Sequence, residues 1–234
     1  MPTAVITGAS RGLGLALSRA LAERDWNLII DARDGAAMER VVDDLDAGHR
    51  VTAIAGDVSN PRHRDELAVA VSTAGELDLL VNNASTLGPS PLPGLAEYPL
   101  EELERVLRIN TIAPLALTQQ LLPHLQRAGG TIVNVTSDAG AEAYEGWGGY
   151  GSSKAALDQV SAVLAVEHPS LHIYAFDPGD MRTEMHQDAY PGEDISDRPE
   201  PETVVPSLLR LIVELPPSGR YRAGDLPALE SSNS

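Results

Sequence analysis

The 234-residue chain contains no cysteine, so it can form neither disulfide bonds nor thiolate metal sites. Aromatic residues make up only 4% of it, and no apolar run approaches the roughly 20 residues that would span a membrane. Basic residues are scarce too: 17 of them face 34 acidic residues, which gives a formal charge of −17. This charge argues against nucleic acid or an anionic membrane as the main partner, so an anionic ligand would need a local basic site.

Lysine is nearly absent as well, because Lys154 is the only one in the chain and every other basic residue is arginine.

The opening MPTAVITGAS lacks the basic segment and apolar stretch of a secretion signal. We therefore expect a cytoplasmic protein.

Short apolar runs alternate with amphipathic stretches, which predicts a parallel sheet covered by helices on both faces. Right-handed crossovers would make this a doubly wound α/β fold. We expect strands at residues 3–7, 27–31, 51–56, 77–83, 131–137 and 171–177. We expect helices at residues 12–24, 35–47, 61–74, 100–127 with a break near Pro114, 151–167 and 202–214, and a short closing piece at 219–226.

The chain shows no internal repeat and no linker between domains. We expect one domain over residues 1–228 and a frayed tail at 229–234. Two segments are typical of loops, residues 89–94 and 186–202.

The first predicted strand leads into TGASRGLG, which places Gly8, Gly12 and Gly14 at the turn into a helix. Glycines there let backbone amides approach a pyrophosphate, and the helix N-terminus favours its negative charge. A turn that is merely tightly packed would show the same pattern.

The second predicted strand ends in IIDARD, which offers both Asp31 and Arg33. An acidic residue there would bind the ribose hydroxyls of NAD, whereas an arginine would hold the extra phosphate of NADP. The sequence does not fix the register that decides between them. Because Arg11 adds a second guanidinium, we favour NADP(H), with NAD(H) as the alternative. The alternative is that Arg11 and Arg33 are simply solvated charges on the surface.

Two further segments suit a nucleotide. Asp57 follows the third strand, where its carboxylate could accept a bond from an adenine amino group. It could instead cap the helix that starts near Pro61, although Ser59 or Asn60 could do so equally well. VNNAS, residues 81–85, closes the fourth strand at the edge where parallel sheets bind ligands, but its asparagines could simply secure the turn.

Tyr150 and Lys154 are four residues apart and lie on one face of the predicted helix. A tyrosine with an ordinary pKa near 10 is a poor base, and a nearby ammonium favours the phenolate. We expect Lys154 to lower the pKa of Tyr150 and to bind ribose hydroxyls as a compact point charge. The alternative is that a single lysine fell there by accident.

Ser137 ends the fifth strand, where its hydroxyl could bind a substrate carbonyl. Asn110 lies in a predicted helix although asparagine has a poor helix propensity, so it could hold a water or kink the helix.

These motifs together resemble the short-chain dehydrogenase/reductase family over almost the whole chain. TGASRGLG, GDV, NNA, Asn110, Ser137, YGSSK and DPGDMRT follow the family's order and approximate spacing, and Ser85 departs from it where glycine is usual. The resemblance implies a Rossmann-like fold and a catalytic set of Asn110, Ser137, Tyr150 and Lys154. The cofactor-binding residues expected from the motifs and the resemblance are Gly8, Ser10, Arg11, Gly12, Leu13, Gly14, Arg33, Asp57, Val58, Asn83, Ala84, Tyr150, Lys154, Pro178, Gly179, Met181 and Thr183.

The activity that the resemblance implies is metal-free hydride transfer between a nicotinamide and a carbonyl or hydroxyl group of a small molecule, as in an NADP-dependent carbonyl reductase or alcohol dehydrogenase. Tyr150 would protonate the developing alkoxide and Asn110 would hold a water. Residues 184–201 resemble a substrate lid, and the helices at 100–127 and 151–167 would pair in a homodimer or homotetramer. The alternatives are a non-catalytic nucleotide-binding regulatory module of the same fold and an epimerase or dehydratase of nucleotide sugars.

Overall fold

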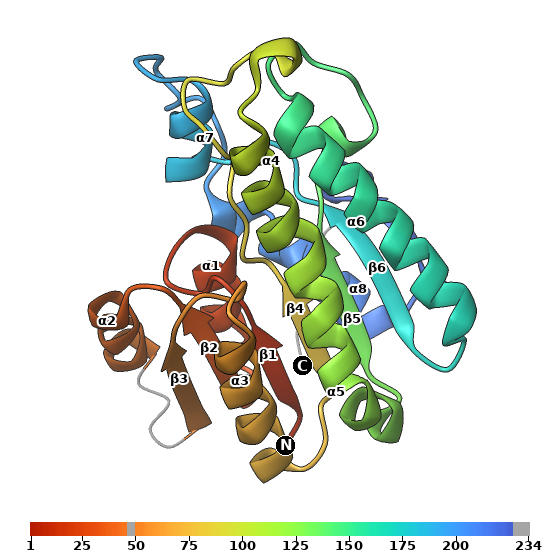
Figure 1. The fold of residues 1–234 in the computed structure, drawn as a ribbon. Coiled ribbons are helices and arrows are strands. Elements are labelled where there is room, and N and C mark those ends of the chain that lie inside the picture. Colours follow the sequence, from red (N-terminus) through yellow and green to blue (C-terminus); the bar gives the residue numbers. More distant parts are fainter. Residues whose placement is uncertain (46–49, 227–234) are drawn as a thin grey trace.

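A seven-stranded parallel sheet forms the centre of the molecule, in the strand order β3-β2-β1-β4-β5-β6-β7 (Figure 1). The computed structural model describes residues 1–45 and 50–226. The strands are β1 (Thr3–Ile6), β2 (Asn27–Ala32), β3 (Val51–Ala55), β4 (Leu79–Asn82), β5 (Thr131–Val135), β6 (His172–Asp177) and β7 (Gly219–Arg222).

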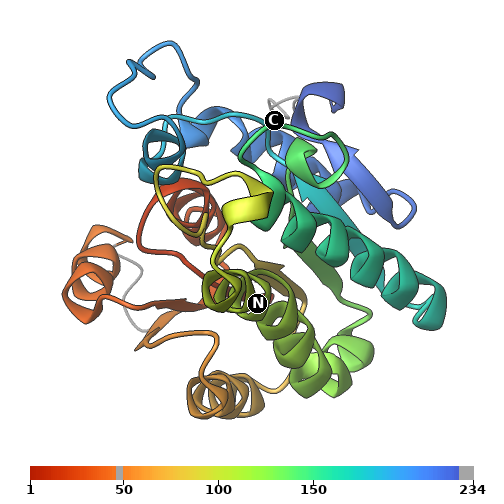
Figure 2. The ribbon, with the colours of Figure 1, turned by 45° about the horizontal axis from the view of Figure 1, so that its top comes forward.

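Helices cover both faces of this sheet. Helices α1, α2 and α8 share a core with one face, and α3, α5 and α6 share a core with the other (Figures 1 and 2). The helices are α1 (Gly12–Ala22), α2 (Gly35–Leu45), α3 (Pro61–Ala74), α4 (Leu100–Leu107), α5 (Ala113–Ala128), α6 (Gly148–Glu167), α7 (Glu184–Ala189) and α8 (Val205–Glu214). This is the doubly wound α/β fold that the sequence predicts.

The central strands are apolar without interruption because both of their faces are buried. In β1, Ala4 and Ile6 belong to the core under α1, whereas Val5 between them belongs to the core under α5. Successive side chains of one strand therefore pack into two separate cores, one on each face of the sheet.

The six predicted strands are confirmed, with ends that differ by at most two residues. The predicted closing piece at 219–226 is a seventh strand, β7, followed by a short 3-10 helix, η6 (Ala223–Asp225). The last predicted helix starts later than expected, because η5 (Pro201–Thr203) is a separate 3-10 turn. The predicted tail at 229–234, and residues 46–47 and 227–228, lie outside the described residues.

The predicted break near Pro114 is confirmed, because the helix expected at 100–127 is interrupted by a turn that ends two residues before this proline. A π-helical turn, η3 (Arg108–Ile112), joins α4 to α5 and contains Asn110. Pro114 lies in the first turn of α5, directly after this π-turn. Such π-turns often occur at functional sites.

No helix within residues 1–45 and 50–226 is long and apolar enough to cross a membrane.

Candidate active site

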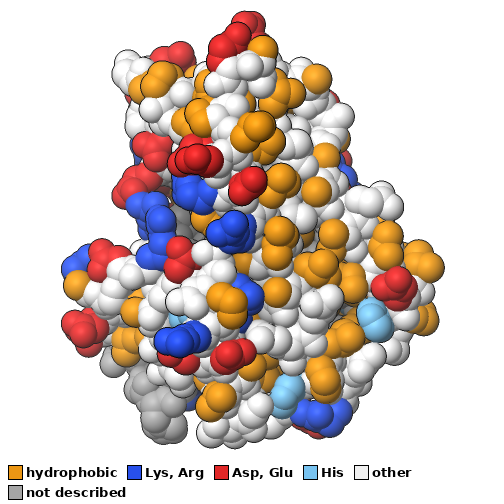
Figure 3. Space-filling model, in the orientation of Figure 1, with side chains coloured by type: hydrophobic (Ala, Val, Ile, Leu, Met, Phe, Trp, Pro, Cys, Tyr) orange, Lys and Arg blue, Asp and Glu red, His pale blue; other side chains and the backbone are white. Residues whose placement is uncertain are grey.

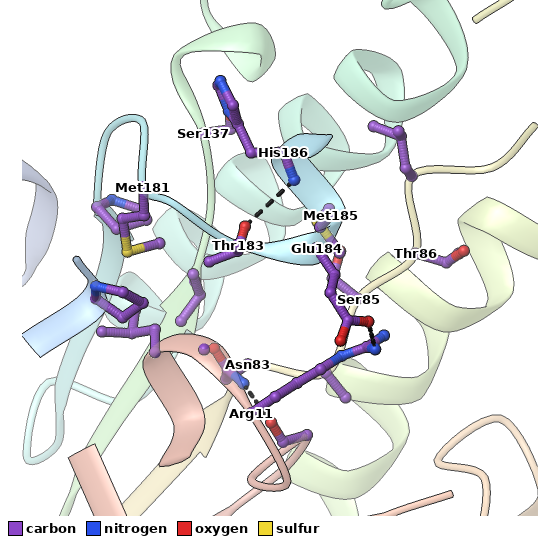
Figure 4. A pocket seen from close by; sticks show the side chains of 18 of the residues that line it. Arg11, Asn83, Ser85, Thr86, Ser137, Met181, Thr183, Glu184, Met185 and His186 are labelled. Atoms are coloured by element: carbon purple, nitrogen blue, oxygen red, sulfur yellow. Dashed lines mark hydrogen bonds and ion pairs between the residues drawn. The ribbon is translucent and has the colours of Figure 1, made fainter. Parts of the chain in front are cut away.

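A cleft of about 1370 Å³ lies at the carboxyl edge of the sheet, where the strands end and the loops begin. Of the residues predicted to bind cofactor or catalyse, all line this cleft except two, Gly14 and Asn110. Topology therefore brings together residues from position 8 to position 183. Figure 4 shows part of the lining.

The glycine turn after β1 has the backbone that a pyrophosphate site requires. Gly8 has a φ of +67°, and a Cβ there would lie 2.9 Å from Ala84 Cα. A Cβ added to Gly14 would lie 2.5 Å from the Gly8 carbonyl oxygen. The lack of a side chain at Gly14 therefore lets α1 pack closely against the turn. Arg11 gives the first turn of α1 no side-chain cap, which leaves backbone N–H groups for an anion.

Asn83 secures the glycine turn, which is the structural alternative for the asparagines of VNNAS. Its Nδ2 donates to the carbonyls of Thr7 at 2.9 Å and Gly8 at 3.1 Å. The N–H groups of Asn83 and Ala84 both donate to Thr7 Oγ1 at 3.0 Å. The end of β4 and the turn after β1 are thereby one rigid unit beside the cleft.

Asp31 and Arg33 differ in their surroundings at the end of strand β2. Asp31 is 1% exposed, and its oxygens accept the Gly8 N–H at 2.8 Å and lie 2.9 Å from His63 Nε2. Arg33 is exposed and lines the cleft together with Arg11 and Arg40. Figure 3 shows basic side chains gathered beside acidic ones between α2 and α7. Arg33, directly after β2, therefore faces the cleft as an exposed charge, whereas both carboxylate oxygens of Asp31 have partners within the chain.

Asp57 does not cap the following helix. Asn60 caps α3 by accepting the Arg62 N–H, while Asp57 accepts the Ser59 N–H at 2.8 Å. Burial would raise the pKa of the Asp57 carboxyl, but the bonds from Ser59 and the charge of Arg33 outweigh it, so the pKa is lowered. An ionised carboxylate consequently stands at the Arg33 end of the cleft.

Helix α7 closes over the glycine turn through an ion pair between Arg11 and Glu184 (Figure 4). Thr183 caps this helix, because its Oγ1 accepts the His186 N–H at 3.2 Å. The same helix starts the segment 184–201 that resembles a lid. The expected role of Thr183 in binding the cofactor stays a prediction.

Tyr150 and Lys154 lie on one face of α6 and are 8% and 2% exposed. The lysine Nζ lies 5.4 Å from the centroid of the tyrosine ring and donates to the Val135 carbonyl at 2.8 Å. The helical spacing of the YGSSK motif therefore brings both side chains into the cleft, as expected.

The expected lowering of the Tyr150 pKa is wrong for the chain alone. Burial raises the pKa of the phenol, while the hydroxyls of Ser85 and Ser137 act in the opposite direction and the charges of Asp177 and Asp138 add to the rise. Burial also lowers the pKa of Lys154 to about 8. The phenol is thus protonated at neutral pH.

Ser137 stands where β5 ends. Its hydroxyl donates to Asp138 Oδ1 at 2.9 Å and accepts the Ala139 N–H at 3.2 Å. Rotation about the Cβ–Oγ bond would turn the hydroxyl proton toward a ligand in the cleft without moving the backbone.

Asn110 is buried beside the cleft and holds the loop after β4. Its Oδ1 accepts the Thr86 N–H at 2.9 Å and the Ser85 hydroxyl at 3.1 Å, and its Nδ2 donates to the Thr86 carbonyl and to Ser153 Oγ. It therefore fixes the position of Ser85, the residue that departs from the family pattern. A water held near Asn110 stays a prediction.

Sequence reasoning missed two groups of site residues. Trp147 and Tyr190 form an aromatic wall next to Tyr150, with the Trp147 and Tyr150 ring centroids 5.8 Å apart. Arg220 and Arg222 of β7 contact Asp177 behind the site. An aspartate at the end of a buried strand was the available signal, because a buried carboxylate requires a partner.

Comparisons with known proteins agree with this geometry. The short chain dehydrogenase family profile matches residues 2–194. The chain is 32% identical over 191 residues to "Diacetyl reductase [(S)-acetoin forming]" of Staphylococcus epidermidis, covering 78% of this chain and 72% of that protein. It is 36% identical over 177 residues to "Rhamnolipids biosynthesis 3-oxoacyl-[acyl-carrier-protein] reductase" of Pseudomonas aeruginosa, covering 73% and 68%.

A solved short chain dehydrogenase from Shigella flexneri, complexed with NADP, superposes with a TM-score of 0.89 at 27% identity and covers 95% of this chain and 97% of that one. The match of the family profile over most of the sequence, together with this fold and these relatives, shows that the chain belongs to the short-chain dehydrogenase/reductase family of oxidoreductases.

Proposed function

We propose that the chain is an NADP-dependent carbonyl reductase acting on small molecules. One observation carries this proposal: Tyr150 and Lys154 are buried on one face of α6, in a cleft that also contains Ser137 and an arginine-flanked glycine turn. A buried phenol and ammonium side by side are costly to maintain and are expected at a site that moves protons.

The residues of the cleft fit a dinucleotide. Gly8 lines the cleft, and the uncapped start of α1 leaves backbone N–H groups for a pyrophosphate. Asp57 would accept the adenine amino group, and Thr183 would hold the nicotinamide amide. When bound, the nicotinamide supplies the hydride, which no side chain can provide.

Three observations support NADP over NAD. Asp31 has both carboxylate oxygens engaged by Gly8 and His63. Arg11 and Arg33 line the cleft and can form charge-assisted bonds with a 2′-phosphate. The Shigella flexneri relative of the same fold is complexed with NADP.

The site holds the proton that a reduction consumes. Because burial raises the pKa of Tyr150, the phenol keeps its proton at neutral pH and can donate it to the oxygen of a carbonyl substrate. The Ser137 hydroxyl would hold the same oxygen. Lys154 would bind ribose hydroxyls with the ammonium protons that are not bonded to Val135.

The substrate side of the cleft is apolar. Leu87, Trp147, Met185 and Tyr190 pack around Tyr150, and acidic Glu145 and Glu184 also line the cleft. These surroundings favour neutral carbonyl compounds with apolar substituents over strongly anionic ones. The named reductase relatives act on carbonyl groups of different molecules, which agrees with the reaction class.

We further propose a homodimer or homotetramer in the cytoplasm. Apolar side chains stand exposed on the described helices that family members use for pairing: Ile112 beside α5 is 56% exposed, and Val163 and Val166 on α6 are 42% and 81% exposed. Burial of these side chains between copies would remove them from water. A monomer in sedimentation equilibrium would contradict this part of the proposal.

A panel of neutral ketones, diketones and aldehydes, tested with NADPH and with NADH, examines the function directly. We expect oxidation of NADPH with at least one class, and oxidation at least about 100-fold slower by the Tyr150→Phe variant. Tight NADPH binding without turnover of any carbonyl class would instead favour the regulatory module.

A further inference from the structure

The last strand of the sheet places an arginine behind the candidate catalytic residues. The Arg220 guanidinium donates from Nη2 to the Ser137 carbonyl at 3.0 Å and to Asp177 Oδ2 at 3.1 Å, and from Nε to Asp158 Oδ2 at 3.1 Å. One side chain thus joins the end of β5, the end of β6 and helix α6.

Sheet register explains how these groups meet. Strand β7 pairs with β6 so that Arg220 lies beside Ala175 and Arg222 beside Asp177. Residues two apart on a strand point to the same face, which here is the face covered by α6. Asp158 lies one helical turn beyond Lys154 on that helix.

Asp177 is the group that these arginines hold. Its carboxylate is 1% exposed, and Oδ2 lies 3.1 Å from Arg220 Nη2 and 3.3 Å from Arg222 Nε. Its other oxygen accepts the Gly179 N–H at 3.0 Å. Gly179 has a φ of +73° and starts the segment that carries Met181 and Thr183 into the cleft.

The charge of Asp177 also reaches the active site. Burial and the charges of Asp177 from β6 and Asp138 from η4 (Asp138–Gly140) raise the pKa of Tyr150. The hydroxyls of Ser85 and Ser137 lower it, and Lys154 lies beside the ring. Arg220 and Arg222 partly neutralise Asp177, and so limit its effect on the phenol.

We propose that Arg220 is a positioning residue for the reductase reaction. It fixes the carbonyl of Ser137 and the Asp177–Gly179 turn in one arrangement and offsets the negative charge that faces Tyr150. The inference rests on the proposed function for its kinetic consequences, but its geometric part concerns the chain alone.

The first experiment compares Arg220→Met with Arg222→Met. The second variant is the matched control, because it lies on the same strand and face and contacts Asp177 but not Ser137. We expect Arg220→Met to lower kcat about 10- to 100-fold, since small displacements of reacting groups have effects of this size, with the NADPH dissociation constant changed less than about threefold. Arg222→Met should lower kcat less than about threefold, and Arg220→Lys should recover part of the loss.

The pH profile separates positioning from mere stability. Arg220→Met leaves Asp177 less neutralised, so the pH of half-maximal alcohol oxidation should rise by about 0.5–1 unit. Asp177→Asn removes the charge and keeps an oxygen for the Gly179 N–H, so the same midpoint should fall. A purely structural role would not move the two midpoints in opposite directions.

Hydrogen exchange of the segment 178–185, measured by mass spectrometry, needs no turnover. We expect faster exchange there in Arg220→Met than in Arg222→Met, with unchanged exchange in β1 and β4. If Arg220→Met does not fold, the double variant with Asp177→Asn removes the uncompensated charge and is compared with Asp177→Asn alone.

The outcomes are distinguishable. If the parent enzyme reduces no carbonyl compound, the proposed function is wrong. Hydrogen exchange of the segment 178–185 then tests by itself whether Arg220 positions the Asp177–Gly179 turn. An Arg220→Met variant with parental kcat, pH midpoint and exchange overturns the inference while the proposed function stands.

Discussion

Asp31 and His63 form a buried pair beneath the glycine turn: Asp31 Oδ2 lies 2.9 Å from His63 Nε2, and Asp31 Oδ1 accepts the Gly8 N–H. The side chains are 1% and 3% exposed. The hydrogen bond to Asp31 raises the pKa of His63 against the effect of burial. Both carboxylate oxygens of Asp31 are therefore bonded within the chain, whereas Arg33, two residues later, is exposed in the cleft.

Replacing Arg33 by alanine should weaken NADPH binding about 10- to 100-fold, the range of a lost charge-assisted bond to a phosphate. NADH binding should change less than about twofold, because NADH carries no 2′-phosphate. Titration calorimetry with both nucleotides measures the difference. Arg40→Ala is the control for a nearby cleft arginine and should have the smaller effect. Equal losses for the two nucleotides with Arg33→Ala would remove the argument for NADP.

Glu184→Gln should tighten NADPH binding about two- to fivefold. Glu184 pairs with Arg11 in an exposed ion pair, and such pairs contribute little, so a phosphate competes for Arg11 at a small cost. Asp188→Asn removes the same charge from the same helix, but its side chain does not line the cleft, so it should leave affinity unchanged. Weaker NADPH binding by Glu184→Gln would show that the pair helps to hold the cofactor.

Tyr150→Phe should lower turnover at least about 100-fold, the usual contribution of general acid catalysis. The ring still packs against Trp147, so the thermal midpoint and the NADPH dissociation constant should stay close to those of the parent. Stopped-flow measurement of NADPH oxidation on a substrate that the parent reduces gives the rate. Parental turnover by this variant would exclude Tyr150 as the proton donor.

Lys154→Met should abolish turnover and yet stabilise the fold at about pH 7 by roughly 1–3 kcal/mol. Burial lowers the pKa of Lys154 from 10.5 to about 8, so the folded parent holds its ammonium at a cost below pH 8. Methionine has a similar unbranched shape and no charge. Urea unfolding of both proteins measures the difference.

The sign of the pH dependence follows from the same shift. Between about pH 8 and 10.5 the unfolded parent binds more protons than the folded one, so the parent gains stability as the pH rises. The advantage of Lys154→Met should therefore shrink over this range. Tyr150→Phe serves as the control and should show no such convergence there, and an advantage independent of pH would contradict the burial argument.

Much of the fold could be predicted because the central strands are buried on both faces and so are apolar without a break. The break between α4 and α5 could be predicted near Pro114, but its π-helical form could not. Asn110 bonds to the Thr86 backbone, and this tertiary contact accompanies the π-turn. Pro114 and Pro123, the local signals, leave α5 continuous.

The site residues that were predicted belong to compact motifs, whereas those missed depend on strand pairing. Asp31 and Arg33 could not be told apart until β2 had a register. Arg220 contacts Ser137 across 83 positions of sequence, and alternating arginines in a short terminal strand resemble a solvated edge. The pKa of Tyr150 was expected to fall because the neighbouring charge was considered without the burial that outweighs it.

The single lysine also allows selective chemical labelling of the candidate active site. Lys154 is the only side-chain amine in the 234-residue sequence, and it is 2% exposed. Amine-directed reagents would therefore find no lysine on the surface of the folded protein. With a pKa of about 8, this amine is half unprotonated at mildly alkaline pH and reacts as a nucleophile once a reagent reaches it. The rate of lysine acylation thus reports how often the candidate active site opens to solvent.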